Sequence, residues 1–175
     1  MMTALRIGNF KAFAETQRIP IRPLTLIYGA NSSGKSSILH GLLLARHAME
    51  TGELDVHLTN VGGESVDLGG FRQYVHSREF NRRVEWAADL DPCRSNDGRR
   101  MNIFTSMKQA TMLLQLGVAL DDQDRLLPNA VPEIHTYEIL ADGRSLLRMS
   151  RRRDGRLRID RLDHEHPVFR EAISA

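Results

Sequence analysis

Gly29-Ala30-Asn31-Ser32-Ser33-Gly34-Lys35-Ser36 is the stretch of this 175-residue chain that decides the fold. It has the spacing G-x-x-x-x-G-K-[ST], which is typical of a loop that joins a strand to a helix and surrounds phosphate groups. These residue types at these offsets arise by chance in roughly one random chain of this length in a hundred. The flanks agree, because residues 24–28 predict a short buried strand entering the loop and residues 36–46 predict a helix leaving it.

The residue types of the loop suit a nucleoside triphosphate with Mg²⁺. A triphosphate carries about four negative charges, which backbone N–H groups turned inward can hold. Gly29 and Gly34 permit the close approach that a Cβ would block, and the helix near Lys35 directs its positive end at the phosphates. We expect Lys35 to reach the β- and γ-phosphates and the Ser36 hydroxyl to ligate Mg²⁺. The alternative, a turn that only joins two elements, does not explain the lysine and the serine.

The composition fits one globular domain over residues 1–175. Hydrophobic residues make up 41% of the chain and charged residues 26%, and the net charge is only +2. No apolar run approaches the length of a transmembrane helix, and the first residues show no secretion signal. The single cysteine, Cys93, excludes an intrachain disulfide and a cysteine-based zinc cluster. We therefore expect a cytoplasmic protein.

Strand patterns surround the loop. Residues 5–13 alternate apolar and polar side chains as a half-buried strand does, and residues 18–23 predict a second extended segment bounded by prolines. Residues 83–89 predict a further strand, whereas residues 113–120 fit either a helix or a strand.

Two Asp-Gly dipeptides mark hairpin turns in the last third of the chain. Asp142-Gly143 and Asp154-Gly155 separate three β-rich runs, which cover residues 133–140, 145–152 and 156–162. The sequence therefore predicts a three-stranded antiparallel meander within residues 132–162. Its buried face is expected to consist of Leu147, Met149, Leu157 and Ile159.

The N-terminal quarter of the chain resembles a known family. The order is a strand, Asn9-Phe10-Lys11-x-Phe13, a second strand, and then Leu26-Ile27-Tyr28-Gly29-x-Asn31-x-Ser33-Gly34-Lys35-Ser36-Ser37-Ile38-Leu39. This order resembles the ATP-binding head of the SMC/RecF/OLD-type ATPases, the ABC-like branch of P-loop proteins that is often described as AAA domains. Asn31 and the Ser-Ser-Ile-Leu after the lysine separate this branch from kinases and small GTPases. The resemblance covers residues 3–46, and residues 67–76 also resemble the segment after the first helix in bacterial ATPases of this type.

The resemblance implies a fold and a set of site residues. The fold is an α/β P-loop NTPase of the ABC head type, of which the chain carries the N-terminal half with an antiparallel β-meander. Lys11 follows the Asn-Phe pair, where relatives place a basic residue near the phosphates. Gln73 stands where relatives have a glutamine that ligates Mg²⁺ or positions water, although a solvated loop glutamine is the alternative. The candidates for binding ATP are Lys11, Gly29, Ala30, Asn31, Ser32, Ser33, Gly34, Lys35, Ser36 and Ser37, and those for binding Mg²⁺ are Ser36 and Gln73.

Two parts of a hydrolytic head are not found in the sequence. The family needs a strand that ends in Asp-Glu, and the nearest candidate is the run from Leu116 to Asp122, which ends in Asp121-Asp122. A strand or helix that ends in a polar turn is the alternative interpretation of this run. The family also needs a Ser-Gly signature loop from a second head, and no Leu-Ser-Gly-Gly type loop occurs. We therefore assign no catalytic residue and expect an incomplete head, whose hydrolysis depends on a longer protein or on a partner such as a second copy.

The region from Arg144 to Arg161 is basic, with eight arginines against Asp154 and Asp160, a local charge of +6. A basic hairpin can grip nucleic-acid phosphates, so DNA is a candidate partner. Aromatic residues for base stacking are absent from this stretch, and a solvated hairpin explains the arginines equally. The alternative function is therefore a non-catalytic remnant of such an ATPase that interacts with nucleic acid or protein.

Overall fold

The computed structural model describes residues 1–31, 33–56, 58–59, 66–91, 107–127, 129–152 and 154–169. Ser32, Cys93 and Arg153 lie outside these residues. The fold is mixed α/β with a large antiparallel sheet. In chain order the elements are β1 (Met2–Gly8), β2 (Gln17–Pro20), α1 (Lys35–Thr51), β3 (Leu58–Thr59), β4 (Val66–Asp67), α2 (Phe71–Tyr74), the 3₁₀ turn η1 (His76–Arg78), β5 (Val84–Leu90), β6 (Ala110–Gly117), β7 (Glu133–Ala141), β8 (Arg144–Arg151) and β9 (Leu157–Leu162). None of the helices in the described ranges has the length and apolar character needed to cross a bilayer.

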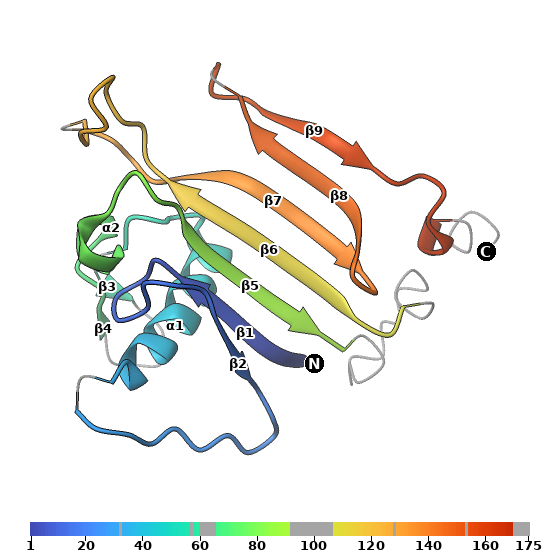
Figure 1. The fold of residues 1–175 in the computed structure, drawn as a ribbon, viewed down its shortest axis with the longest axis horizontal. Coiled ribbons are helices and arrows are strands. Elements are labelled where there is room, and N and C mark those ends of the chain that lie inside the picture. Colours follow the sequence, from blue (N-terminus) through green and yellow to red (C-terminus); the bar gives the residue numbers. More distant parts are fainter. Residues whose placement is uncertain are drawn as a thin grey trace.

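Seven strands form one sheet in the order β2-β1-β5-β6-β7-β8-β9 (Figure 1). The predicted meander is confirmed as β7, β8 and β9, which pair in antiparallel order. Asp142 and Gly143 both have positive φ values, 50° and 81°, as a type I′ hairpin turn requires. The run at residues 113–120, which fits either a helix or a strand, belongs to β6 as far as Gly117. The meander is thus one end of a sheet that begins with β2 and β1.

Helix α1 covers the other end of this sheet. Gly41 lets the helix approach β1 closely, because a Cβ there would lie 2.4 Å from the Ile7 Cδ1 atom. The helix shares a hydrophobic cluster with β1 and β5 that includes Leu5, Ile38, Leu42, Ala45, Trp86 and Ala88. Figure 1 shows α1 behind the β1 end, whereas no helix of the described residues lies over β8 and β9. Among the helices of the described residues, α1 therefore covers the β1–β5 end of this face.

Residues 24–28 are not the buried strand that their apolar pattern predicts. They pair with no strand of the described chain, and Leu24, Leu26 and Tyr28 expose 78%, 77% and 92% of their surface. An extended segment is stable as a strand only when neighbouring strands satisfy its backbone groups. No described strand takes that position, so the segment runs outside the sheet. The expectation that the loop follows a strand of the sheet is wrong for the same reason.

Leu157 and Ile159 share a face with Leu147 and Met149, as the alternating pattern predicts, but they are not buried. Leu157 exposes 38% and Ile159 58% of its surface. Alternation fixes which side chains share a face, whereas burial needs a second layer, and none of the described residues provides one over β9. The predicted buried face is therefore wrong for these two residues.

The opposite face of the sheet contains a buried carboxylate that the sequence pattern does not reveal. Asp89 on β5 is fully buried and accepts hydrogen bonds from Thr111 Oγ1 at 2.9 Å and from Arg6 Nη2 at 2.9 Å. Arg18 Nη2 lies 3.0 Å from its other oxygen. Burial alone raises the pKa of Asp89, but the Thr111 hydroxyl and the two guanidinium groups outweigh it and lower the pKa below its usual value. This network joins β2, β1, β5 and β6.

Candidate functional site

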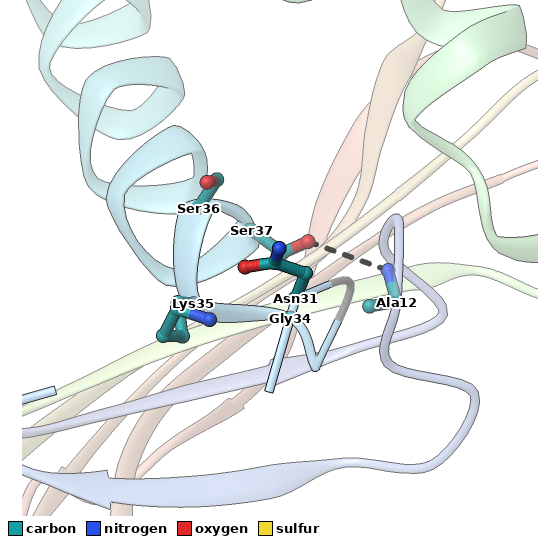
Figure 2. A pocket seen from close by; sticks show the side chains of 6 residues that line it. All are labelled: Ala12, Asn31, Gly34, Lys35, Ser36 and Ser37. Atoms are coloured by element: carbon teal, nitrogen blue, oxygen red, sulfur yellow. Dashed lines mark hydrogen bonds between the residues drawn. The ribbon is translucent and has the colours of Figure 1, made fainter. Parts of the chain in front are cut away.

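An open pocket of about 340 Å³ lies where the glycine-rich loop joins α1. Its lining residues are Ala12, Asn31, Gly34, Lys35, Ser36 and Ser37 (Figure 2). Five of them come from the loop and the first turn of α1, and Ala12 comes from the turn after β1. The structure therefore brings half of the predicted nucleotide-binding residues into one pocket. Gly29, Ala30, Ser33 and Lys11 are not among its lining residues.

Gly34 is the point where the loop becomes a helix. It is the N-cap of α1 and has left-handed backbone angles, with φ at 90°. A Cβ on Gly34 would lie 3.2 Å from the Ala12 Cβ atom and 3.2 Å from the Phe13 Cζ atom. Both its conformation and the space around it therefore require glycine. The turn at residues 9–13 thus holds the start of α1 in place.

The first turn of α1 has free hydrogen-bond donors. Within the described chain, the backbone N–H groups of residues 34–37 have no acceptor, and α1 has no side-chain cap and no acidic residue in its first turn. Free N–H groups at the positive end of a helix attract an anion. These features favour a negatively charged ligand in the pocket.

Lys35 carries the positive charge of the pocket. Its ammonium group donates to the backbone oxygens of Gly29 at 2.8 Å and Ala30 at 2.6 Å. The side chain therefore bends back into the loop, as Figure 2 shows. Ser36 is exposed, so its hydroxyl is accessible to a ligand. Ser37 is buried, and its Oγ accepts a long hydrogen bond of 3.5 Å from the Ala12 N–H.

The two segments that resemble the ATPase family pack against each other beside this pocket. Asn9 and Lys11 have positive φ values, 49° and 45°, in the tight turn after β1. The Lys11 backbone N–H donates to the Tyr74 backbone carbonyl at 2.6 Å. The Nδ1 atom of His76 lies 2.7 Å from the Lys11 backbone carbonyl oxygen. The rings of Phe10 and Tyr74 also pack, with their centroids 5.4 Å apart. The segment at residues 67–76 therefore supports the turn that touches Gly34.

Lys11 and His40 form a half-buried basic pair that the motifs reveal only in part. Burial lowers the pKa of Lys11, and the nearby Asp67 partly offsets this. Burial and then the charge of Lys11 lower the pKa of His40, whose Nδ1 is buried and has no hydrogen-bond partner in the described chain. His40 is not part of the loop motif. It lies four residues after Ser36, which is about one helical turn further along α1.

Gln73, the predicted second ligand of Mg²⁺, lies on α2 and is exposed. Its side chain folds over Gly69, because a Cβ on Gly69 would come within 2.3 Å of the Gln73 Oε1 atom. It does not line the pocket, and its role with Mg²⁺ stays a prediction.

The acidic candidates after β6 serve a local turn. The Asp121 carboxylate accepts the N–H groups of Gln123 and Arg125, each at 2.9 Å, and also pairs with the Arg125 guanidinium. The structure therefore agrees with the alternative interpretation, a strand followed by a polar turn. In the described part of the chain, no three His, Cys, Asp or Glu side chains are grouped to hold a metal.

Acidic partners reduce the charge of the arginine-rich hairpin. Four of its arginines form ion pairs: Arg144 with Asp163, Arg151 with Glu133, Arg152 with Asp160 and Arg158 with Asp154. Arg148 stands across from Arg161 on β9 and from Glu138 on β7. Contact with DNA stays a prediction, and it now centres on Arg148 and Arg161.

Comparison with known families agrees with the motif. A family model described as AAA domain matches residues 4–86, a little under half of the chain. The match supports an AAA-type ATPase-like domain. It runs from β1 through the loop, α1 and α2 into β5, and thus contains every residue of the pocket. Domains of this type generally use a nucleotide and Mg²⁺. A search of curated proteins found no match.

Proposed function

We propose that this chain is the ATP-binding module of an SMC/RecF/OLD-like ATPase, a partial head that needs residues from elsewhere to hydrolyse ATP. The observation that carries the proposal is the start of α1, where Gly34, Lys35, Ser36 and Ser37 line one pocket and their backbone N–H groups have no acceptor among the described residues. An AAA domain match over the same residues supports a nucleotide as the ligand.

The pocket residues fit ATP with Mg²⁺. The N–H groups of residues 34–37 would donate to phosphate oxygens, with the positive end of α1 behind them. Lys35 would exchange its bonds to the Gly29 and Ala30 oxygens for bonds to the β- and γ-phosphates. Ser36 would hold the metal through its accessible hydroxyl. When bound, Mg²⁺ would neutralise charge between the β- and γ-phosphates.

The segment at residues 24–28 supports the proposal that the head is partial. In an extended strand, Leu24, Leu26 and Tyr28 would lie on one face and Ile27 on the other, so both faces would be apolar, as in strands buried on both faces. The segment leads directly into the loop but has no neighbouring strand in the described chain. The outer side of α1 is also apolar in part, with Leu39 exposed by 54% and Met49 by 76%. We infer that strands from a partner or from another part of the protein pair with residues 24–28 and cover these side chains.

The pocket lining gives the second reason to separate binding from hydrolysis. None of its six residues is acidic. Hydrolysis needs a carboxylate to orient the attacking water and to share the metal, and Asp121 is engaged in its own turn. We therefore propose that the pocket binds phosphate, while none of its six lining residues would activate water.

A titration with a fluorescent ATP analogue, with and without Mg²⁺, tests the proposed function. Wild type should bind more tightly when Mg²⁺ is present, and Ser36→Ala should lose that gain while keeping its metal-free affinity. Ser150→Ala on β8 is the matched control and should behave as wild type. Steady-state phosphate release should be absent from the isolated chain, and its presence would refute the partial head. Absence of nucleotide binding would instead favour the alternative function, a non-catalytic remnant.

A further inference from the structure

His40 lies on the side of α1 that faces β1 and the turn after it. Ser37, three residues earlier, accepts a hydrogen bond from the Ala12 N–H through its Oγ at 3.5 Å. A Cβ on Gly41, the next residue, would lie 3.9 Å from the Phe10 Cε1 atom. Residues three apart on a helix are neighbours on its surface, and helical side chains lean toward the helix N-terminus. The His40 imidazole therefore lies next to these contacts, beside the turn that reaches the pocket.

The His40 ring contains a buried nitrogen that lacks a partner. Its Nδ1 is shielded from solvent and makes no hydrogen bond within the described chain. Most buried polar side-chain atoms in folded proteins have a hydrogen-bond partner, so an exception calls for an explanation. Burial, followed by the charge of Lys11, lowers the pKa of His40 and keeps the ring neutral at neutral pH. One nitrogen of a neutral imidazole accepts a hydrogen bond, so Nδ1 can serve as an acceptor that lacks a donor.

The Lys11 ammonium is a nearby donor that has few acceptors. An ammonium has three N–H groups. In the described chain one of them donates a long hydrogen bond of 3.4 Å to the Leu68 backbone oxygen. Asp67 attracts the ammonium, but burial has the larger effect and lowers the pKa of Lys11. The ammonium therefore has unused donors near the ring nitrogen that needs one.

The backbone of Lys11 is fixed, so its side chain is the part that can change partners. The Lys11 N–H donates to the Tyr74 oxygen at 2.6 Å, and the Lys11 carbonyl oxygen lies 2.7 Å from the His76 Nδ1 atom. The next residue, Ala12, lines the pocket. The long Lys11 side chain is thus attached at the edge of the pocket and can turn toward it.

We propose that His40 is a positioning residue for the nucleotide: its Nδ1 accepts a hydrogen bond from the Lys11 ammonium when that ammonium leaves the Leu68 oxygen and turns to the phosphates. This role rests on the proposed function and adds a residue that the loop motif does not contain. His40 is not among the residues that line the pocket, so it acts through Lys11 and not on the nucleotide itself. Both groups gain, because Nδ1 obtains a donor and the ammonium exchanges one long hydrogen bond for charge-assisted bonds to the imidazole and the phosphates.

Calorimetric titration of ATP·Mg²⁺ into wild type, His40→Leu and His40→Asn tests this role. Leucine removes the acceptor, and the affinity for ATP should fall about tenfold or more, the factor expected for one hydrogen bond to a charged group. Asparagine should preserve most of the affinity, because its Oδ1 atom can accept at the position of the imidazole Nδ1. His47→Leu is the matched control and should bind ATP as wild type does. It removes another α1 imidazole that has a buried nitrogen without a partner, about two helical turns further from the pocket.

A double-mutant cycle with Lys11→Met separates positioning of the lysine from a general effect on the helix. If His40 acts through Lys11, His40→Leu should cause no further loss of ATP affinity in the Lys11→Met background. Thermal unfolding of the same variants measures stability. His40→Leu should melt no lower than wild type, because leucine removes a buried atom that has no partner. A merely structural histidine would instead lose stability and affinity together.

The outcomes distinguish the role of His40 from the proposed function. Wild-type affinity in His40→Leu, or an equal effect of this substitution with and without Lys11, overturns the role of His40 and leaves the proposed function intact. A His40→Asn variant that binds ATP as weakly as His40→Leu also overturns it. A wild type that binds no ATP overturns the proposed function and the role of His40 with it.

Discussion

Replacing Gly34 with alanine should damage both the fold and the pocket. A residue with a Cβ in the left-handed conformation of Gly34 costs about 1–2 kcal/mol. The new Cβ would also lie 3.2 Å from the Ala12 and Phe13 side chains, a few tenths of an ångström inside the optimal carbon–carbon distance of about 3.5–4.0 Å. We expect a total loss of about 2–3 kcal/mol, which lowers the melting temperature of a domain of this size by about 5–10 °C. The displaced helix start should weaken ATP binding at least tenfold, because the N–H groups of residues 34–37 move with it.

Gly52→Ala is the control at the other end of the same helix. Gly52 is also left-handed, with φ at 78°, but a Cβ there would meet nothing within 4 Å. We expect a loss of about 1 kcal/mol and an unchanged ATP affinity. Thermal unfolding and titration with a fluorescent ATP analogue measure both quantities. Wild-type affinity in Gly34→Ala, or an equal loss in both variants, would refute the assignment of Gly34 to the pocket.

Three other predictions concern parts of the chain away from the pocket. Asp89→Asn should lower the free energy of unfolding at neutral pH by about 2–3 kcal/mol in urea titrations, because two arginines lose their buried partner. The pKa of Asp89 is lowered in the fold, so its contribution is complete above about pH 4 and is lost as the pH falls further; acid should therefore destabilise wild type more than the variant. Amide exchange at residues 24–28 should be as fast as in an unfolded peptide, and protection there in the isolated chain would contradict an unpaired segment. Arg161→Gln should reduce the slope of log binding constant against log salt concentration for duplex DNA by about one. Arg152 is ion-paired with Asp160, so Arg152→Gln should change this slope less. Equal effects of the two substitutions would contradict a specific contact between the hairpin and DNA.

Local signals in the sequence predict much of this fold. The loop motif predicts α1 and its start, and Asp142-Gly143 predicts the β7–β8 turn, because few residues adopt positive φ at two successive positions. The alternation at Leu147 and Met149 predicts which side chains share a face. Each of these features is decided within a few residues of the chain.

The remaining features depend on contacts between distant segments. No local pattern shows that β5 pairs with both β1 and β6, or that Asp89 meets arginines from β1 and β2. Residues 24–28 have the composition of a strand, but pairing requires neighbours that the described chain does not supply. The motif also gives no sign of the contact between Ala12 and Gly34, which joins segments more than twenty residues apart. Local signals therefore predict the helices and strands, whereas the structure is needed to show which of them pack or pair with one another.

Isothermal titration of ATP·Mg²⁺ into wild type, Lys35→Ala and Lys108→Ala tests the central claim most directly. Lys108→Ala removes the same charge at an exposed position outside the pocket and is the matched control. We expect one ATP for each wild-type chain, the same affinity for Lys108→Ala, and an affinity at least tenfold lower for Lys35→Ala, since charge-assisted hydrogen bonds to phosphate each contribute about 1.5–3 kcal/mol. Equal affinity of Lys35→Ala and wild type would show that the glycine-rich loop is not where this protein holds a nucleotide.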